Sequence, residues 1–148
     1  MKHIPDLCKR LTNNMEKLRV LVVGCGHMGT SHARAYHQLE DFEIAGLVSR
    51  KPASRQKLSD ELGGLPTFGD FDEALATTQP DVVSINTYPE THAAYAEKSL
   101  RANAHVFLEK PIALTVEEGQ RLVDLALSKN RKMVIGYILR VHPAWAKF

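Results

Sequence analysis

The stretch VLVVGCGHMGTSH, residues 20–32, decides the fold that we expect for this chain of 148 residues. Four apolar residues run directly into glycine, a pattern typical of a buried parallel strand. Gly24, Gly26 and Gly29 then follow in the spacing G-x-G-x-x-G. That spacing is weak evidence alone, but between a strand and a helix it predicts a loop that binds the pyrophosphate of a dinucleotide.

The loop residues have separate expected roles. Gly24 would allow a tight turn, Gly26 would let the backbone approach the pyrophosphate, and Gly29 would let helix and strand pack closely. His27 and Met28 complete the loop and belong to the predicted cofactor site. A methyltransferase could use a similar loop for S-adenosylmethionine, and features farther along the chain have to decide between these two ligands.

Strands and helices alternate through the rest of the chain. This order predicts an α/β domain with a doubly wound parallel sheet, the Rossmann fold, and strand order 3-2-1-4-5-6. Asp70 is a candidate N-cap, and Thr115 with Glu118 has the spacing of a capping box. The expected strands are 19–24, 43–49, 66–68, 81–86, 105–109 and 132–137, and the expected helices are 27–39, 52–63, 71–78, 89–102 and 115–130.

The length allows one domain, at residues 18–148, after an N-terminal extension at residues 1–17. Apolar residues in the extension recur at helical spacing, which is typical of a short amphipathic helix. Met15 could equally be the true start of the protein. The four apolar positions are Ile4, Leu7, Leu11 and Met15.

Composition excludes several classes of protein. The net charge of +2 is too small to indicate a nucleic-acid partner. No apolar run approaches the roughly 18 residues that a membrane-spanning helix needs, and the N-terminus lacks a signal-peptide core. Cys8 and Cys25 do not form a disulfide framework or a metal cluster, so we expect reduced thiols in a cytoplasmic protein and no metal site. Cys25 and His27 are expected to be spacers whose side chains point away from the phosphates.

The end of the second expected strand bears on the choice of cofactor. NAD-binding domains usually place an acidic residue about 20 residues past the glycine loop, where it holds the ribose 2′-hydroxyl. Here that position is Ser49, followed by Arg50 and Lys51. Basic residues would attract a 2′-phosphate, and arginine can bind it with two hydrogen bonds. We therefore predict that NADP(H) is favoured over NAD(H), although Arg50 and Lys51 could also be ordinary solvated charges.

The fifth expected strand ends in a charge pair. His105–Leu108 leads into Glu109 and Lys110, and Pro111 follows. Parallel strands end on the edge of the sheet where ligands bind, and a partly desolvated lysine there can take part in proton transfer. Taken alone, Glu109 and Lys110 are equally well explained as a solvated strand end. A methyltransferase would leave them without a role.

The chain resembles the cofactor domain of the Gfo/Idh/MocA family, the glucose–fructose oxidoreductase and inositol dehydrogenase type. The resemblance covers residues 19–148, and Glu109-Lys110-Pro111 at the end of a fifth strand is its most specific mark. It rests on four segments, GCGHMGTSHARAY (24–36), NTYPETHAAYA (86–96), HVFLEKPIALT (105–115) and GYILRVHP (136–143).

The resemblance implies roles for the residues at the strand ends. Lys110 would be the catalytic residue, which faces the nicotinamide and the substrate oxygen and helps to move the substrate proton. Glu109 would lie near the nicotinamide ribose, and Pro111 would shape the turn, often through a cis peptide.

Other matches imply further cofactor contacts. Thr87 and His92 match the family's loop after strand four, which lines the cofactor, and Arg140 matches an arginine near the nicotinamide end. His92 taken alone is equally well explained by packing. Tyr88 stands where the family commonly has proline, and it could stack on a cofactor ring. Asn103 replaces a usual glycine and can keep its left-handed turn.

The resemblance also implies a second domain, which carries the substrate pocket and mediates assembly in family members. That domain is absent from these residues. The expected function is that of the nucleotide-binding domain of an oxidoreductase acting on a sugar, cyclitol or related hydroxyl–carbonyl pair. The expected state is a homo-oligomer. The alternative is a stand-alone dinucleotide-binding or sensor module without turnover.

Overall fold

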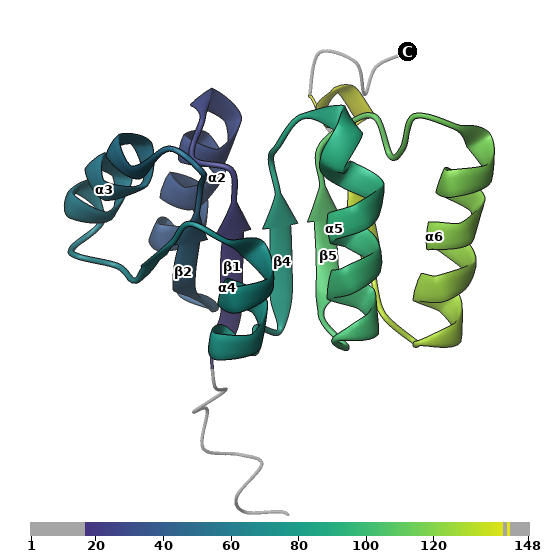
Figure 1. The fold of residues 1–148 in the computed structure, drawn as a ribbon, viewed down its shortest axis with the longest axis horizontal. Coiled ribbons are helices and arrows are strands. Elements are labelled where there is room, and N and C mark those ends of the chain that lie inside the picture. The colour runs from purple at the N-terminus through teal and green to yellow at the C-terminus, as the bar shows by residue number, and fades with distance from the viewer. Residues whose placement is uncertain (1–16, 141, 143–148) are drawn as a thin grey trace, which may run out of the picture.

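The structure is a computed structural model that describes residues 17–140 and 142. Six parallel strands form one sheet in the order β3-β2-β1-β4-β5-β6, which confirms the predicted Rossmann topology (Figure 1). The proposed amphipathic helix of the N-terminal extension lies outside the described residues. The strands are β1 (Leu18–Val23), β2 (Phe42–Val48), β3 (Thr67–Phe68), β4 (Val82–Ile85), β5 (His105–Leu108) and β6 (Met133–Ile135).

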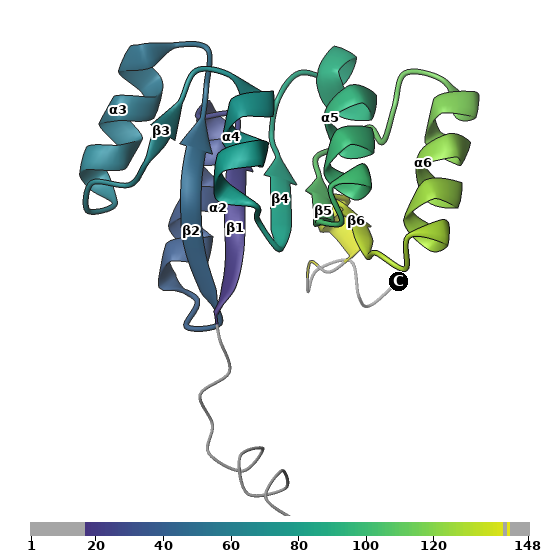
Figure 2. The same cartoon turned by 60° about the horizontal axis from the view of Figure 1, so that its bottom comes forward.

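The helices cover both faces of the sheet. Figures 1 and 2 show α4 and α5 in front of the strands, with α6 beside α5, and α2 behind the strands. The apolar core is divided in the same way, because one cluster contains residues of α2 and α3 and the other contains residues of α4, α5 and α6. The helices are α2 (His27–Gln38), α3 (Pro52–Glu61), α4 (Phe71–Thr78), α5 (Pro89–Arg101) and α6 (Val116–Ser128), and the 3-10 helix η1 (Ile138–Arg140) follows β6.

Strand β1 shows why the apolar run is unbroken. Val20 and Val22 belong to the cluster under α2 and α3, whereas Leu21 and Val23 belong to the cluster under α4, α5 and α6. Side chains of a strand alternate between the faces of its sheet, and here both faces are covered. All four side chains are therefore buried, with at most 1% exposure.

The predicted helix caps are present, with one difference. Asp70 Oδ1 accepts from the backbone N–H of Glu73 at 2.9 Å, and Thr115 Oγ1 accepts from that of Glu118 at 3.2 Å. The Glu118 carboxylate accepts from the N–H of Leu114 at 3.3 Å, one residue before the N–H that the capping box predicts. Asn103 has a φ of 62°, as expected for a residue at a glycine position.

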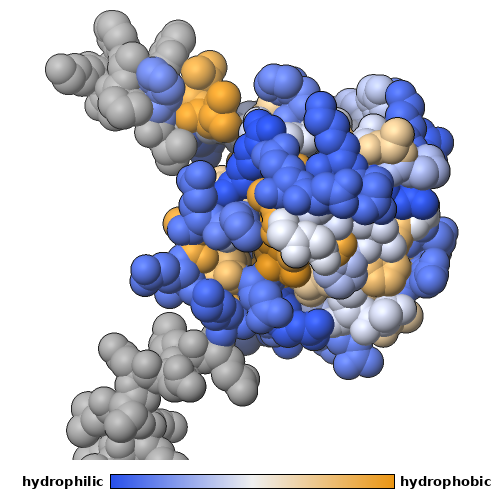
Figure 3. Space-filling view, turned by 90° about the vertical axis from the view of Figure 1, so that its left-hand side faces the viewer, coloured by the Kyte–Doolittle hydropathy of each residue, from blue (hydrophilic) through white to orange (hydrophobic). Residues whose placement is uncertain are grey.

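The surface on the α3 side is mostly hydrophilic (Figure 3). Apolar side chains are exposed around β6 and η1, where Val134 is 56% and Ile138 59% exposed. Among the described residues, no helix is long and apolar enough to cross a membrane. Whether the apolar surface is covered in a homo-oligomer stays a prediction.

Candidate functional site: a groove at the carboxyl ends of the strands

A groove of about 820 Å³ opens at the carboxyl edge of the sheet. The strand order reverses between β1 and β4, and ligands of such sheets bind at this switch point. Five of the predicted site residues line the groove, namely Met28, Thr87, Glu109, Lys110 and Arg140. The other lining residues are Asn86, Pro89, Gly136, Tyr137, Ile138 and Leu139.

The glycine loop has the geometry that its spacing predicts. Gly24 has a φ of +96°, and a Cβ there would lie 2.5 Å from the carbonyl oxygen of Asn86. A Cβ on Gly29 would overlap the carbonyl oxygen of Gly24, so glycine lets α2 pack this closely on the loop. Gly26, by contrast, has no atom within 4 Å of its Cβ position. The open space at Gly26 suits the close approach of a ligand.

The N-terminus of α2 lacks a cap from its own sequence. Gly26 is the N-cap residue, no side chain accepts from the first-turn N–H groups, and the first turn contains no acidic residue. Free N–H groups and the positive end of the helix dipole favour an anion at this position. These features fit the pyrophosphate of a dinucleotide.

Cys25 takes no direct part in the groove. Its side chain is buried, and Sγ donates to the carbonyl oxygen of Val48 at 3.5 Å. Burial raises the pKa of the thiol to about 11, an effect that the charge of Arg55 partly offsets. Cys25 is thus a spacer, as predicted, whereas His27 lies exposed at the first position of α2. Within residues 17–140 and 142, no group of His, Cys, Asp or Glu is arranged to hold a metal ion.

Basic side chains gather at the end of β2. Arg50 and Lys51 are exposed, and Ser49 Oγ accepts from the N–H of Lys51 at 3.3 Å. Arg55, on the first turn of α3, donates from Nη1 to the carbonyl oxygen of Ser49 at 2.7 Å. The acidic residues Asp41 and Glu43 lie at the other end of this strand.

The turn after β5 carries Glu109 and Lys110 into the groove. Glu109 is 7% exposed and Lys110 is exposed. The backbone N–H of Lys110 donates to Glu109 Oε2 at 3.3 Å. The peptide bond between Lys110 and Pro111 is cis, as the resemblance implies. A Cβ on Gly136 would lie 3.2 Å from the Glu109 carboxylate, so glycine at that position leaves room for the acid.

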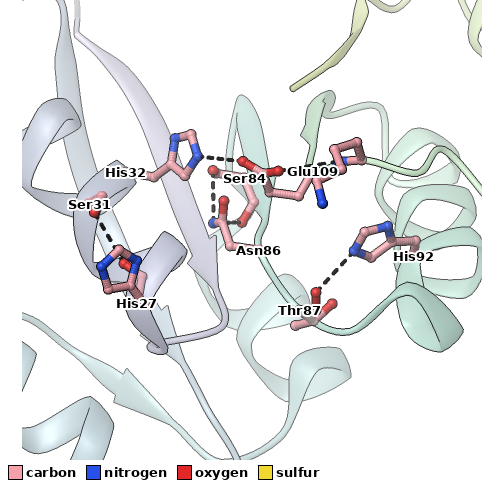
Figure 4. Close-up of polar contacts among 9 residues, drawn as sticks. His27, Ser31, His32, Ser84, Asn86, Thr87, His92 and Glu109 are labelled. Carbon is pink, nitrogen blue, oxygen red and sulfur yellow. Dashed lines mark hydrogen bonds and ion pairs between the residues drawn. The ribbon is translucent and has the colours of Figure 1, made fainter. Parts of the chain in front are cut away.

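A histidine of α2 contacts this carboxylate. His32 Nε2 lies 2.9 Å from Glu109 Oε1 (Figure 4). The imidazole also packs against the ring of Phe107, with centroids 4.8 Å apart. The pair joins the helix after the glycine loop to the turn after β5. The sequence prediction did not include His32.

The end of β4 carries a buried polar network. Asn86 Nδ2 donates to the carbonyl and hydroxyl oxygens of Ser84 at 3.0 and 3.1 Å (Figure 4). Asn86 Oδ1 is buried and has no hydrogen-bond partner among the described residues. Burial raises the pKa of Tyr36 on the neighbouring α2, an effect that Ser84 partly offsets. The polar end of β4 therefore faces α2.

Thr87 and Tyr88 begin the loop that follows. The hydroxyls of Thr87 and Thr91 lie 2.7 Å apart. Tyr88 is 72% exposed, and its backbone is the N-cap of α5. Tyr88 does not line the groove directly, so its stacking on a cofactor ring stays a prediction.

His92 lies beneath the groove. Its side chain has 0% exposure, with Nδ1 at 2.7 Å from the carbonyl oxygen of Pro111 and Nε2 at 3.1 Å from that of Thr87. Carbonyl oxygens only accept, so a neutral ring can donate to one of the two. This burial fits the packing interpretation, because His92 connects the loop after β4 to the turn after β5. Contact of its side chain with a cofactor would require that loop to open.

Arg140 ends η1 at the rim of the groove. Its guanidinium carbon lies 5.9 Å from the centroid of the Tyr137 ring, within the range of a cation–π contact. Both side chains are exposed. The groove is thus bounded by a helix N-terminus on one side and by cationic and aromatic groups on the other.

Comparison with known proteins agrees with this architecture. The model of the Gfo/Idh/MocA family, described as "Oxidoreductase family, NAD-binding Rossmann fold", matches residues 18–137. The chain belongs to this family. The match spans β1 to β6 and so includes the glycine loop and Glu109-Lys110-Pro111.

Relatives in the family include dehydrogenases of sugars and cyclitols. UDP-N-acetylglucosamine 3-dehydrogenase of Acidithiobacillus ferrooxidans is 35% identical over 130 residues, which cover 88% of this chain and 40% of that protein. D-glucoside 3-dehydrogenase of Escherichia coli is 30% identical over 110 residues, 74% of this chain and 31% of that protein. The structure of scyllo-inositol dehydrogenase from Lactobacillus casei with NAD(H) and scyllo-inositol superposes with a TM-score of 0.84 at 27% identity, and covers 89% of this chain and 39% of that one. This chain therefore spans at most about 40% of these relatives.

The side chains of the site that sequence reasoning missed include His32, Asn86 and Tyr137. His32 lies one helical turn past Gly29 and so on the same face of α2, which was a usable signal. Asn86 is a polar residue that ends an apolar strand. Tyr137 gave no signal, because its place in the groove depends on the path of the chain after β6.

Proposed function

We propose that this chain is the nucleotide-binding part of an oxidoreductase that prefers NADP(H). The whole enzyme would transfer hydride between the nicotinamide and a sugar, cyclitol or related hydroxyl–carbonyl pair. One observation carries the proposal: Glu109 and Lys110 line the same groove as Met28 of the uncapped glycine loop. A dinucleotide with its pyrophosphate at α2 would extend along this groove toward Lys110.

We assign transfer of the substrate proton to Lys110. The bound nicotinamide would supply or take up the hydride at its C4 atom. The exposed ammonium group of Lys110 can donate a hydrogen bond to the substrate oxygen and exchange a proton with it. Glu109, largely buried beside it, would face the nicotinamide ribose.

The cofactor preference rests on the end of β2. Arg50 and Lys51 are exposed where the adenine ribose of a dinucleotide would lie. Arg55 is held to the same turn by its bond to the Ser49 carbonyl oxygen. These cations can bind a 2′-phosphate, and no acidic residue ends the strand to repel it.

Calorimetry with NADPH and NADH tests the preference. We expect NADPH to bind more tightly than NADH. Arg50→Ala should lower the affinity for NADPH by roughly 10-fold and leave the affinity for NADH within about 2-fold of its original value. Lys129→Ala removes an exposed charge just past the C-terminus of α6 and should change neither affinity. Tighter binding of NADH than NADPH would refute the preference.

Turnover tests the assignment of Lys110. The whole enzyme would be assayed with a panel of polyols and ketoses, and Lys110→Met should abolish its turnover while dinucleotide binding persists. Turnover that survives Lys110→Met would exclude the catalytic role. Binding of NADPH by the whole enzyme without turnover of any substrate would instead support the alternative of a dinucleotide-binding or sensor module. A homo-oligomeric state and a cytoplasmic location complete the proposal.

A further inference from the structure

The contact between His32 and Glu109 joins two segments that are distant in sequence, and it is largely buried. His32 lies on α2 three residues past Gly29, and Glu109 precedes Lys110 on the turn after β5. The two residues are 77 positions apart, and their side chains are 19% and 9% exposed. A hydrogen bond to a carboxylate at this depth is screened by water much less than the exposed pairs of the surface.

The carboxylate of Glu109 is held from several sides. An ionised carboxylate only accepts hydrogen bonds, so His32 Nε2 must donate to Oε1. The other oxygen, Oε2, accepts from the backbone N–H of Lys110. Gly136 of the segment after β6 leaves just enough room for the carboxylate. Glu109 therefore has little freedom to turn while His32 is in place.

We propose that His32 is a positioning residue for Lys110, which acts through Glu109. The proposal rests on the proposed function, because it gives His32 a task within dinucleotide binding. His32 and the pyrophosphate-binding N-terminus belong to the same helix, and Glu109 and Lys110 share one turn. The hydrogen bond makes these two segments one unit, so that binding of the pyrophosphate at α2 sets the orientation of the turn at the nicotinamide end.

Nuclear magnetic resonance of the full chain tests the link without any ligand. We expect a slowly exchanging Nε2–H proton on His32 that disappears in Glu109→Ala. His32→Phe keeps a ring against Phe107 but removes the donor, and it should shift the amide resonance of Lys110. His37→Phe, at an exposed histidine of the same helix, is the matched control and should leave Lys110 unchanged. An unaltered Lys110 amide in His32→Phe would overturn the proposal.

Binding of whole and partial ligands then tests the consequence. His32→Phe should weaken NADPH by roughly 10-fold, the size expected for loss of one charge-assisted hydrogen bond. It should leave the affinity for 2′-phosphoadenosine 5′-diphosphate, which keeps the pyrophosphate but lacks the nicotinamide and its ribose, within about 2-fold. His32→Gln keeps an N–H donor at a similar distance and should restore most of the NADPH affinity.

The outcomes separate the two proposals. If His32→Phe lowers the affinity for both ligands equally, His32 only supports the fold, and the positioning role is wrong. Failure of the unmodified protein to bind either ligand would refute the proposed function. The resonances of His32 and Lys110 would still decide whether the two segments are linked.

Discussion

Helices α2 and α6 both begin at the carboxyl edge of the sheet, yet their N-termini differ in chemistry. At α6, Thr115 caps the first turn, and Glu117 and Glu118 place negative charge beside the helix dipole. At α2, glycine stands at the N-cap, no side chain caps the helix, and the first turn has no acid. At α6 the N–H of Glu118 donates to Thr115, whereas the structure shows no side-chain cap for the first turn of α2.

The difference indicates how a functional helix end can be told from a structural one. An N-terminus with its own cap gains about 1 kcal/mol of stability from it. An N-terminus without a cap gives up that stabilisation, and the N–H groups remain free to bind an anion. Helices α3 and α5 also lack a side-chain cap, and α5 too begins at the groove, but both begin with proline, which has no N–H to offer an anion.

The largest expected effect concerns the packing of α2. Gly29→Ala would place a Cβ against the carbonyl oxygen of Gly24, a backbone atom that cannot move aside. We expect a loss of more than about 3 kcal/mol in the free energy of unfolding, measured with urea. Gly26→Ala, where the Cβ position is open, should unfold like the unmodified protein. Equal stability of both variants would contradict the close packing.

The buried thiol of the glycine loop has an effect that depends on pH. The folded pKa of Cys25 is raised from 9.0 to about 11, so the unfolded chain releases this proton first. Stability should therefore fall by about 2 kcal/mol as pH rises from 9.0 to 11, which is most of the limit of about 2.8 kcal/mol that two pKa units at about 1.4 kcal/mol each allow. Thermal unfolding at several pH values in a Cys8→Ser background measures this change in stability. Cys25→Ala should remove this part of the pH dependence.

A side-chain cap on α2, of the kind that α6 has, should weaken dinucleotide binding and raise the stability of the fold. In Gly26→Asp the backbone is already extended, so the new carboxylate can accept from the first-turn N–H groups and repel a pyrophosphate. We expect NADPH binding to weaken by roughly 10-fold, with stability raised by a few tenths of a kcal/mol. Gly26→Asn caps without charge and should lose less affinity. Unchanged binding in Gly26→Asp would place the pyrophosphate elsewhere.

The smallest expected effect is the removal of the cap on α6. Thr115→Ala loses the hydrogen bond from the N–H of Glu118 and should cost about 1 kcal/mol. NADPH affinity should not change, because Thr115 does not line the groove. Urea unfolding and calorimetry on the same variant measure both quantities. A parallel loss of affinity would mean that α6 shares in binding.

Much of the fold was predictable because its signals are local. Apolar runs such as Val20–Val23 are short enough to be strands, and Asp70 and Thr115 mark the start of helices. The glycine spacing depends on a turn of a few residues, which any chain with this sequence must make in the same way. The expected and observed elements therefore differ by only one or two residues at most ends.

The site was only partly predictable. Lys110, Glu109 and Thr87 could be placed at strand ends by counting, since the carboxyl ends of parallel strands share one edge. The burial of His92 was not predictable, because it depends on carbonyl groups of two separate loops. For a histidine on a helix, sequence spacing indicates only the face of the helix on which it lies.

By itself, the sequence determined the order of strands and helices, the glycine loop and the acid–lysine pair after β5, because each depends on neighbours within a few residues. Only the tertiary structure decided that His32 meets Glu109, that Gly136 makes room for this acid, and that Asn86 lies against the glycine loop. These contacts exist because the sheet places β1, β4, β5 and β6 side by side. Segments far apart in sequence meet at its edge, and no local pattern records which of their side chains will touch.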